Sequence, residues 1–130
     1  MGKSSNLARV VDASGGIGYQ AGAGGAVTQS TSKSTAVTLN KSSGQITMNN
    51  AALAAGAIAA FTVNNSLMKS TDTVVLTMKQ DGVTNLANYN VWPLAAAADG
   101  SFIVCIRNIG GASLSEAPII NFAIVKGAAA

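Results

Sequence analysis

Short runs in which apolar and polar residues alternate recur along most of the chain. In one of them Val74, Leu76 and Met78 alternate with Thr73, Val75 and Thr77, and the turn residues Gln80-Asp81-Gly82 follow. A period of two residues predicts a half-buried β-strand, and Asp-Gly is a strong turn signal. The same reading predicts strands at Val37–Leu39, Ile46–Met48, Phe61–Val63, Val74–Met78, Tyr89–Val91, Phe102–Ile106 and Ile119–Lys126.

Seven or eight such strands, separated by short turns, predict an all-β fold. This spacing is typical of a β-sandwich or a barrel, and of the two we expect an antiparallel, jelly-roll-like β-sandwich. The alanine-rich stretch Ala51–Ala60 is interrupted by Gly56, so we expect a turn that leads into the strand Ile58–Asn64 rather than a helix. The stretch Leu94–Ala98 is expected to be a loop.

Residues 1–25 differ in composition from the rest of the chain. Six of the twelve residues from Ser14 to Gly25 are glycine, which makes ordering costly in entropy and leaves few side chains to pack. The sequence therefore predicts a flexible Gly-rich N-terminal arm over residues 1–25 and a single β-sandwich domain over residues 26–130. Gly16-Ile17-Gly18-Tyr19-Gln20-Ala21 matches a dinucleotide fingerprint only by composition, since no acidic residue occurs between Asp12 and Asp72.

The last predicted strand is apolar on both faces. Ile120, Phe122 and Ile124 fall on one face, and Ile119, Ala123 and Val125 on the other. A strand that is apolar on both sides is expected to be buried on both sides, so one side should meet the arm or another copy of the chain. The candidate residues for an oligomer or partner interface are Ile119, Ala123, Val125, Tyr19 and Trp92.

Charged residues make up only 10% of the sequence, whereas apolar residues make up 48%. The polar surface must therefore consist mainly of Ser, Thr, Asn and Gln, which suits lasting burial against a partner. The net charge of +3 comes from basic residues that do not cluster, so no nucleic-acid partner is expected. No apolar stretch approaches the length of a membrane span and no signal core follows the N-terminus, so we expect synthesis in the cytoplasm and no membrane partner.

The sequence is poor in groups that carry out catalysis or hold metals. It has no histidine, and its acids are isolated from one another. The single cysteine, Cys105, lies within an apolar strand and is expected to be an inert thiol. We expect no enzyme activity, no catalytic residues, no metal, no cofactor and no small-molecule substrate.

Two blocks of the sequence resemble a family of small virion proteins of tailed bacteriophages. The first runs from Gly24 to Met48 and includes Val27-Thr28-Gln29-Ser30-Thr31-Ser32-Lys33, and the second runs from Arg107 to Ile124 and includes Arg107-Asn108-Ile109-Gly110-Gly111. The resemblance covers about residues 24–126. It implies a β-sandwich subunit on the exterior of the capsid that decorates or cements the shell as a homotrimer and binds the major capsid protein.

Two other functions are weighed against this expectation. A carbohydrate-binding or host-attachment module of a spike or tail fibre would use Trp92, Tyr89 and the Asn-rich turns. A small enzyme would need a pair of acids such as Asp81 and Asp99, each of which is more simply a turn former beside glycine.

Overall fold

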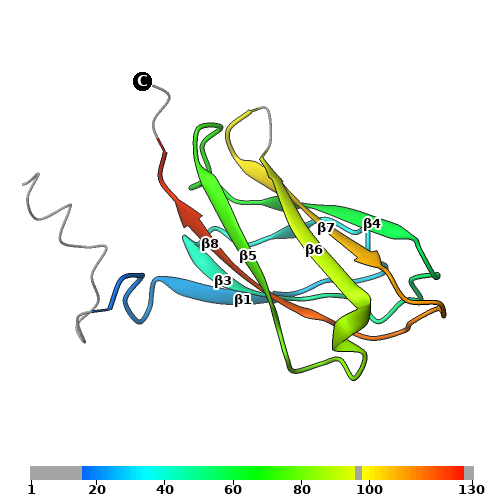
Figure 1. Cartoon of the computed structure of the whole chain (residues 1–130). Helices are drawn as coiled ribbons and strands as arrows, with labels where there is room; N and C mark the ends of the chain where they lie inside the picture. The colour runs from blue at the N-terminus through cyan, green and yellow to red at the C-terminus, as the bar shows by residue number, and fades with distance from the viewer. Residues whose placement is uncertain (1–15, 96–97, 128–130) are drawn as a thin grey trace, which may run out of the picture.

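The computed structural model describes residues 16–95 and 98–127, which form two four-stranded β-sheets and almost no helix (Figure 1). The first sheet has the strand order β1 (Gly24–Thr28), β3 (Ser43–Thr47), β8 (Ile119–Val125) and β5 (Thr73–Lys79). The second sheet has the order β2 (Val37–Thr38), β4 (Ile58–Asn64), β7 (Ser101–Asn108) and β6 (Tyr89–Ala95). A single turn of 3-10 helix, Leu86–Asn88, precedes β6.

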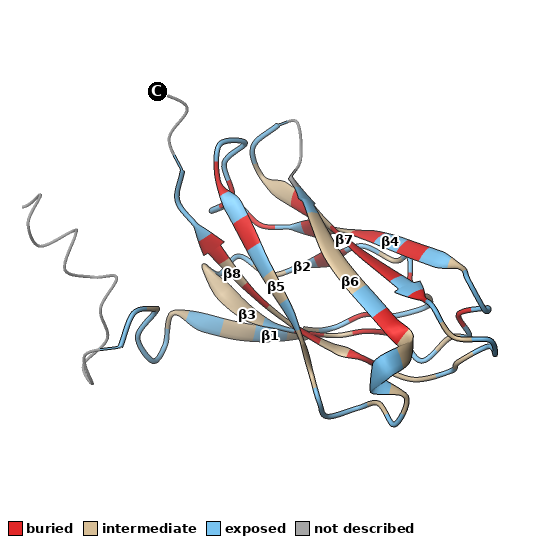
Figure 2. Ribbon diagram, in the orientation of Figure 1, coloured by how far each residue is buried: buried red, intermediate tan, exposed pale blue. Residues whose placement is uncertain are grey.

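Most strands bury every second residue, as their sequences predict, whereas β7 buries the consecutive residues Val104, Cys105 and Ile106. In β4 the side chains of Ala59, Phe61 and Val63 are buried, whereas Ile58 and Ala60 are exposed. The same alternation is visible as bands of buried and exposed residues along the ribbons in Figure 2. Because successive side chains point to opposite faces of a sheet, one face of each sheet forms the core and the other forms the surface.

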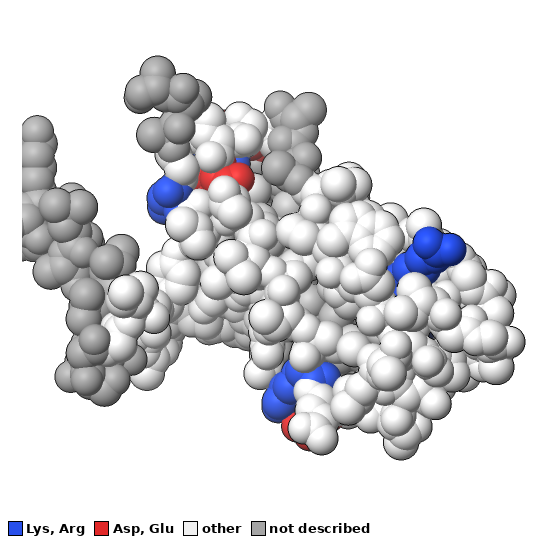
Figure 3. Space-filling model, viewed as in Figure 1, with Lys and Arg blue, Asp and Glu red and all other residues white. Residues whose placement is uncertain are grey.

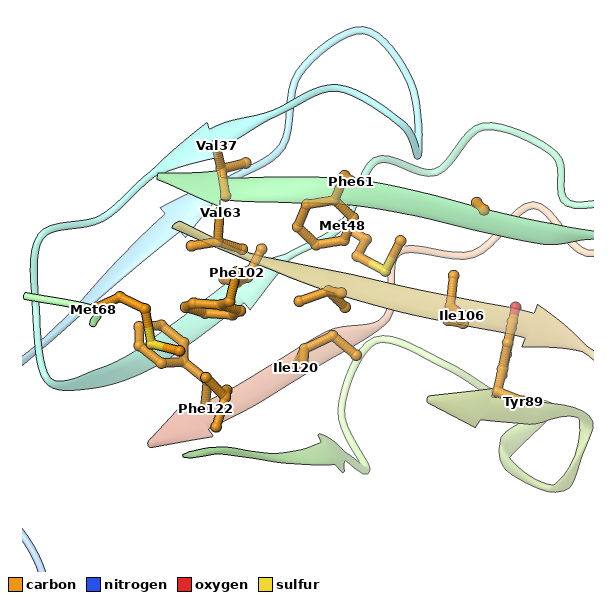
Figure 4. Packing of buried hydrophobic residues seen from close by; sticks show 14 of the residues in the cluster. Val37, Met48, Phe61, Val63, Met68, Tyr89, Phe102, Ile106, Ile120 and Phe122 are labelled. Carbon is orange, nitrogen blue, oxygen red and sulfur yellow. The ribbon is translucent and has the colours of Figure 1, made fainter. Parts of the chain in front are cut away.

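The core lies between the two sheets. Phe102 of β7 and Phe122 of β8 lie with their ring centroids 5.4 Å apart and their planes tilted by 54°, a favourable aromatic geometry (Figure 4). These two strands occupy inner positions in their sheets. Around them pack the buried apolar side chains of Val37, Ile46, Met48, Leu53, Ala59, Phe61, Val63, Met68, Val74, Tyr89, Val104, Ile106, Ile120 and Ile124.

Most neighbouring strands are antiparallel, but one edge pair in each sheet is parallel. β1 pairs with β3, and β2 pairs with β4, in parallel register. The expected sandwich was antiparallel throughout. The difference arises because the chain crosses from one sheet to the other after each of these strands, so β3 and β4 return beside β1 and β2 in the same direction.

Three details of the secondary structure bear on the predictions from the sequence. A turn near Gly56 leads into β4, as predicted. The predicted loop Leu94–Ala98 was wrong for its first two residues, because β6 continues to Ala95; residues 96 and 97 lie outside the described residues. β1 was not predicted, and the predicted boundary between arm and domain falls inside this strand; residues 1–15 of the predicted arm lie outside the described residues.

Glu116 is held by polar groups from two distant segments at one end of the sandwich. Its carboxylate accepts hydrogen bonds from the Thr84 amide at 2.6 Å, the Thr84 hydroxyl at 2.9 Å and the Tyr89 hydroxyl at 2.8 Å. The Thr84 amide, followed by these hydroxyls, lowers the pKa of Glu116 to about 2 although partial burial acts in the opposite direction. The cluster thereby joins the loop before β8 to the segment between β5 and β6.

Lys33 extends this cluster from another loop. It is buried, and its ammonium group donates hydrogen bonds to the backbone carbonyls of Asn49 and Glu116. Burial lowers the pKa of Lys33, and the nearby Glu116 carboxylate partly offsets this effect. Gln29 lies beside it and bridges Thr35 and Asn49 through both ends of its side-chain amide. These contacts tie together loops that the strand pairing alone leaves separate.

Replacing Glu116 with glutamine should weaken the acid dependence of stability. A carboxylate whose pKa is lowered on folding stabilises the fold above its unfolded pKa of 4.5, and this contribution disappears as the pH falls towards about 2. Urea unfolding at stepped pH should therefore show a smaller fall in unfolding free energy over this window for Glu116→Gln than for the parent. Asp81→Asn, at an exposed turn carboxylate, is the control; equal pH dependence in Glu116→Gln and the parent would contradict the assignment.

Replacing Gly44 with alanine should destabilise the first sheet. A Cβ atom at Gly44 would meet the backbone oxygen of Gly25 at 2.6 Å and a methyl group of Leu39 at 2.9 Å, so β1 would have to move away from β3. Overpacking of this kind costs about 1–3 kcal/mol. Gly111→Ala is a matched control, because nothing lies within 4 Å of its added Cβ. If both variants melt at the parent temperature, the close contact between β1 and β3 is not needed for stability.

Candidate functional site

The outer face of the second sheet is rich in exposed apolar side chains. Strand alternation directs to this face the apolar residues Ile58, Ala60, Trp92, Leu94, Ile103 and Cys105 and the polar residues Thr62, Asn64, Asn90, Ser101 and Arg107, which together we call the Trp92 face. Ile58 is 57% exposed and Leu94 is 48% exposed. A contiguous exposed apolar patch on a soluble protein commonly marks an interaction site, since covering it with a partner removes apolar area from water.

Strand register brings the members of the Trp92 face together in rows. Trp92 lies opposite Cys105 on the neighbouring strand, and Cys105 lies opposite Ala60 on the next. The adjacent row contains Leu94, Ile103 and Thr62. The rows therefore extend the apolar surface across three strands rather than along one.

Cys105 occupies the middle of this face, yet only 4% of it is exposed. Burial raises the pKa of its thiol, which keeps the sulfur protonated and unreactive at neutral pH. The prediction of an inert thiol agrees with this environment. Cys105 thus packs beneath its neighbours as an apolar side chain and does not act as a nucleophile.

Arg107 is the only charged residue of the Trp92 face, and it lies at one end of that face. Its Nε donates a hydrogen bond to the Gly56 carbonyl at 3.3 Å. Elsewhere the charged side chains of the described residues are few and stand in small separate groups, as Figure 3 shows for one side of the molecule. The physical character of the face is therefore set by apolar contact and not by charge.

A second apolar feature lies where the segment before β1 meets the end of β8. A shallow groove of about 380 Å³ is lined by Ile17, Gly18 and Tyr19 on one side and by residues 123–126 on the other. The Tyr19 hydroxyl donates a hydrogen bond to the Ile124 carbonyl. This contact fastens the described part of the predicted arm to the outer end of β8.

In the single chain the outer face of β8 is covered only in part, at the end where the arm segment around Tyr19 meets it. Ile120, Phe122 and Ile124 are buried in the core, but Val125 on the other face is 52% exposed. Ile119 and Ala123 on that face are half-buried. Among the described residues, only the segment around Tyr19 covers the outer side of the first sheet, at one end.

The remainder of this outer face is polar but almost uncharged. Residues that flank β8 there are Ser43, Gln45 and Thr47 from β3, with Val75 and Thr77 from β5. The one charged residue, Lys79 at the end of β5, forms an ion pair of 3.1 Å with Asp81. The outer face of the first sheet is therefore richer in polar side chains than that of the second, although Val75 is 48% exposed there.

The structure brings together only some of the predicted interface residues. Tyr19, Ala123 and Val125 line the groove, while Ile119 lies at the opposite end of β8 on the same face. Trp92 lies on the other sheet. The sequence reasoning missed the companions of Trp92, namely Ile58, Leu94 and Ile103, although the two-residue period of each strand was the signal that places them outward.

The residues considered for other chemistry are separated from one another. Tyr89 is buried and bonds Glu116, so it faces the core while Trp92 faces outward. Asp81 pairs with Lys79, whereas Asp99 lies 3.7 Å from the Lys69 ammonium. Neither the proposed sugar pair nor the proposed acid pair shares one site.

Over residues 16–95 and 98–127, no group of three or more cysteine, aspartate or glutamate side chains is placed to hold a metal ion. Over the same ranges, no helix is long and apolar enough to cross a membrane.

Comparisons with known proteins were made at the level of sequence families, individual sequences and folds. No family model, curated protein or solved structure matches the chain.

Proposed function

We propose that this chain is a non-catalytic structural subunit of a bacteriophage virion that decorates or cements the capsid exterior. In this proposal it binds the major capsid protein through the Trp92 face and self-associates as a trimer. The observation that carries the proposal is the Trp92 face itself, an apolar surface across three strands with a single charge at its end. The resemblance of residues 24–126 to small virion proteins supplies the setting.

We also propose that the sandwich is wound as a jelly roll, and the strand order supports this. The antiparallel pairs β3–β8 and β4–β7 lie in different sheets, and the chain passes directly from β3 to β4 and from β7 to β8. A long two-stranded ribbon folded over itself in this way is the basis of jelly-roll winding. The parallel strands β1 and β2 are additions at the edges of this ribbon.

The chemistry of the Trp92 face suits attachment to a surface that repeats many times. Apolar contact gives each copy a modest affinity, and linked copies bind more tightly through avidity. The face carries only one charge, so binding should depend little on ionic strength. The half-exposed outer face of β8, with Ala123 and Val125, remains for contact among the copies of a trimer.

Leu94→Lys should weaken attachment to the shell. Burial of a leucine side chain contributes about 1.5–3 kcal/mol, so placing a charge there should reduce binding at least tenfold. The measurement is co-sedimentation with shells of the virus that encodes the chain, prepared without this protein, at low and high salt. Leu67→Lys is the matched control, because Leu67 is 44% exposed and lies outside the Trp92 face.

The shell contact through the Trp92 face, the decoration function and the trimer are each overturned by a different result. Equal binding by Leu94→Lys and Leu67→Lys would remove the Trp92 face from the shell contact. Absence of any binding by the parent chain would overturn the decoration function. Light scattering of the purified protein measures its solution mass, and a mass that is not a multiple of three chains would overturn the trimer.

The second candidate function, a carbohydrate-binding module, now depends on Trp92 alone. Its indole is half-buried on an open face, and Asn90 is an exposed polar residue on the same strand. An aromatic ring beside polar groups is a common platform for a sugar. A glycan array with hits that Trp92→Ala abolishes would favour this function over decoration, and an array without hits would exclude the tested glycans.

A further inference from the structure

The two sheets have four edge strands, and three of them are protected against pairing with another chain. β2 is only two residues long. β5 and β6 lie side by side, so each covers the edge of the other, and Pro93 removes one backbone donor from β6 (Figure 1). Short strands, covered edges and proline are the usual devices that prevent edge-to-edge association.

β1 has none of these devices. Its sequence, Gly24-Gly25-Ala26-Val27-Thr28, contains no charge and no proline. Among the described residues it forms a strand ladder with β3 and with no other strand; β2 touches it without pairing. One edge of β1 therefore presents backbone N–H and C=O groups that are available to a further strand.

The direction of these free groups follows from one hydrogen bond. The Gln29 amide donates to the Thr47 carbonyl at 2.8 Å, so Gln29 faces β3. In a strand, each residue directs its N–H and its C=O to the same edge, and successive residues direct them to opposite edges. Gly25 and Val27 therefore face β3 as Gln29 does, and Gly24, Ala26 and Thr28 face the open edge.

A lysine that lies close to β1 does not block this edge. Lys41 lies close to Gly25, where an added Cβ would meet its stem at 3.2 Å. Gly25 and Val27 are two residues apart in the strand, so their side-chain positions share one face, and Val27 packs against the core on that face. The stem of Lys41 therefore lies on the inner face and not in the plane of the sheet. Leu39 fills the same inner position, at 3.1 Å from that Cβ.

We propose that the open edge of β1 binds the β1 strand of a second copy of this chain, antiparallel and centred on Ala26. In this arrangement the two Ala26 residues form a hydrogen-bonded pair about a two-fold axis. Gly24 of each copy then pairs with Thr28 of the other in the same manner. The two first sheets join into one continuous sheet with β1 strands at its centre.

A second copy suits this edge better than a strand of other chemistry, for three reasons. Its β1 is an open edge of the same length and is present at equal concentration. Neither strand carries a charge, so the copies meet without repulsion. The residue at the two-fold axis is alanine, whose small side chain lies on the exposed outer face and leaves room for its symmetry mate.

This contact adds a second association surface to the proposed function. It rests on that function only for the place where it would act, the shell. On a shell, a two-fold contact through β1 would link subunits of neighbouring trimers, while the trimer contact itself uses the outer face of β8. Joining the first sheets would also extend their neutral outer faces into one surface. The pairing of β1 itself requires no shell and is measurable in solution.

Ala26→Pro tests the pairing, with Ala26→Ser as the matched control. Proline removes the outward N–H and is tolerated where that N–H faces solvent, so the ladder with β3 is kept. Light scattering over a concentration series should show the mass of the parent and of Ala26→Ser rising to at least twice the mass of Ala26→Pro, which should stay constant. Circular dichroism melting verifies that the variant is folded.

Residue-resolved hydrogen exchange of the parent gives a test that does not depend on any variant. In the unpaired protein the Val27 and Gln29 amides should be protected, while the Ala26 and Thr28 amides exchange freely. At concentrations where the mass doubles, the Ala26 and Thr28 amides should become protected by at least tenfold. Free exchange of these amides in the associated protein, or no doubling at any concentration, would overturn the pairing; a trimer that still binds shells would leave the proposed function intact.

Discussion

Contact between the inner strands β7 and β8 holds the rest of the molecule in place. Phe102 and Phe122 pack across the middle of the sandwich, and each belongs to a strand with a partner on both sides. The period of two residues then determines what each strand carries on its other face. On β7 the outward residues Ile103 and Cys105 form the centre of the Trp92 face, and on β8 the outward residues Ala123 and Val125 line the groove. The core contact thus places both candidate surfaces at once.

The sequence predicted the inner strands well because their burial is recorded in their side chains. Ile46 in β3 and Phe61 in β4 alternate with polar or small residues, and a half-buried strand requires this pattern. Leu94 was assigned to a loop because Pro93 and the following alanines obscure the pattern. β6 has only one hydrogen-bonded partner, and an edge strand of this kind tolerates proline. The pattern of apolar residues in a strand indicates which side chains are buried. Whether the strand lies at the edge of a sheet depends on the order of the strands in space.

The candidate surfaces were less predictable than the core for the same reason. Trp92 was recognised by its residue type, but its neighbours Ile103 and Leu94 come together only through the register of β6 and β7. Tyr89 and Trp92 are close in sequence and were grouped as one site, yet their spacing of three residues places them on opposite faces of a strand. Assigning alternate residues of the strand to opposite faces would have separated Tyr89 from Trp92. The pairing of β4 with β7, which completes the face with Ile58 and Ala60, has no local signal in the sequence.

The glycines before and within the first sheet show how composition can be misread. Gly24 and Gly25 lie in a run that has the composition of a flexible arm, but in the structure they begin β1. Their strand is held close to β3 because Gly44 has no side chain between them, as the 2.6 Å distance from its added Cβ to the Gly25 oxygen demonstrates. Small residues thus allow β1 to join the sheet and also leave it without the bulk or charge that protects most edges. The same glycine-rich composition that hides the strand in the sequence leaves its outer edge open.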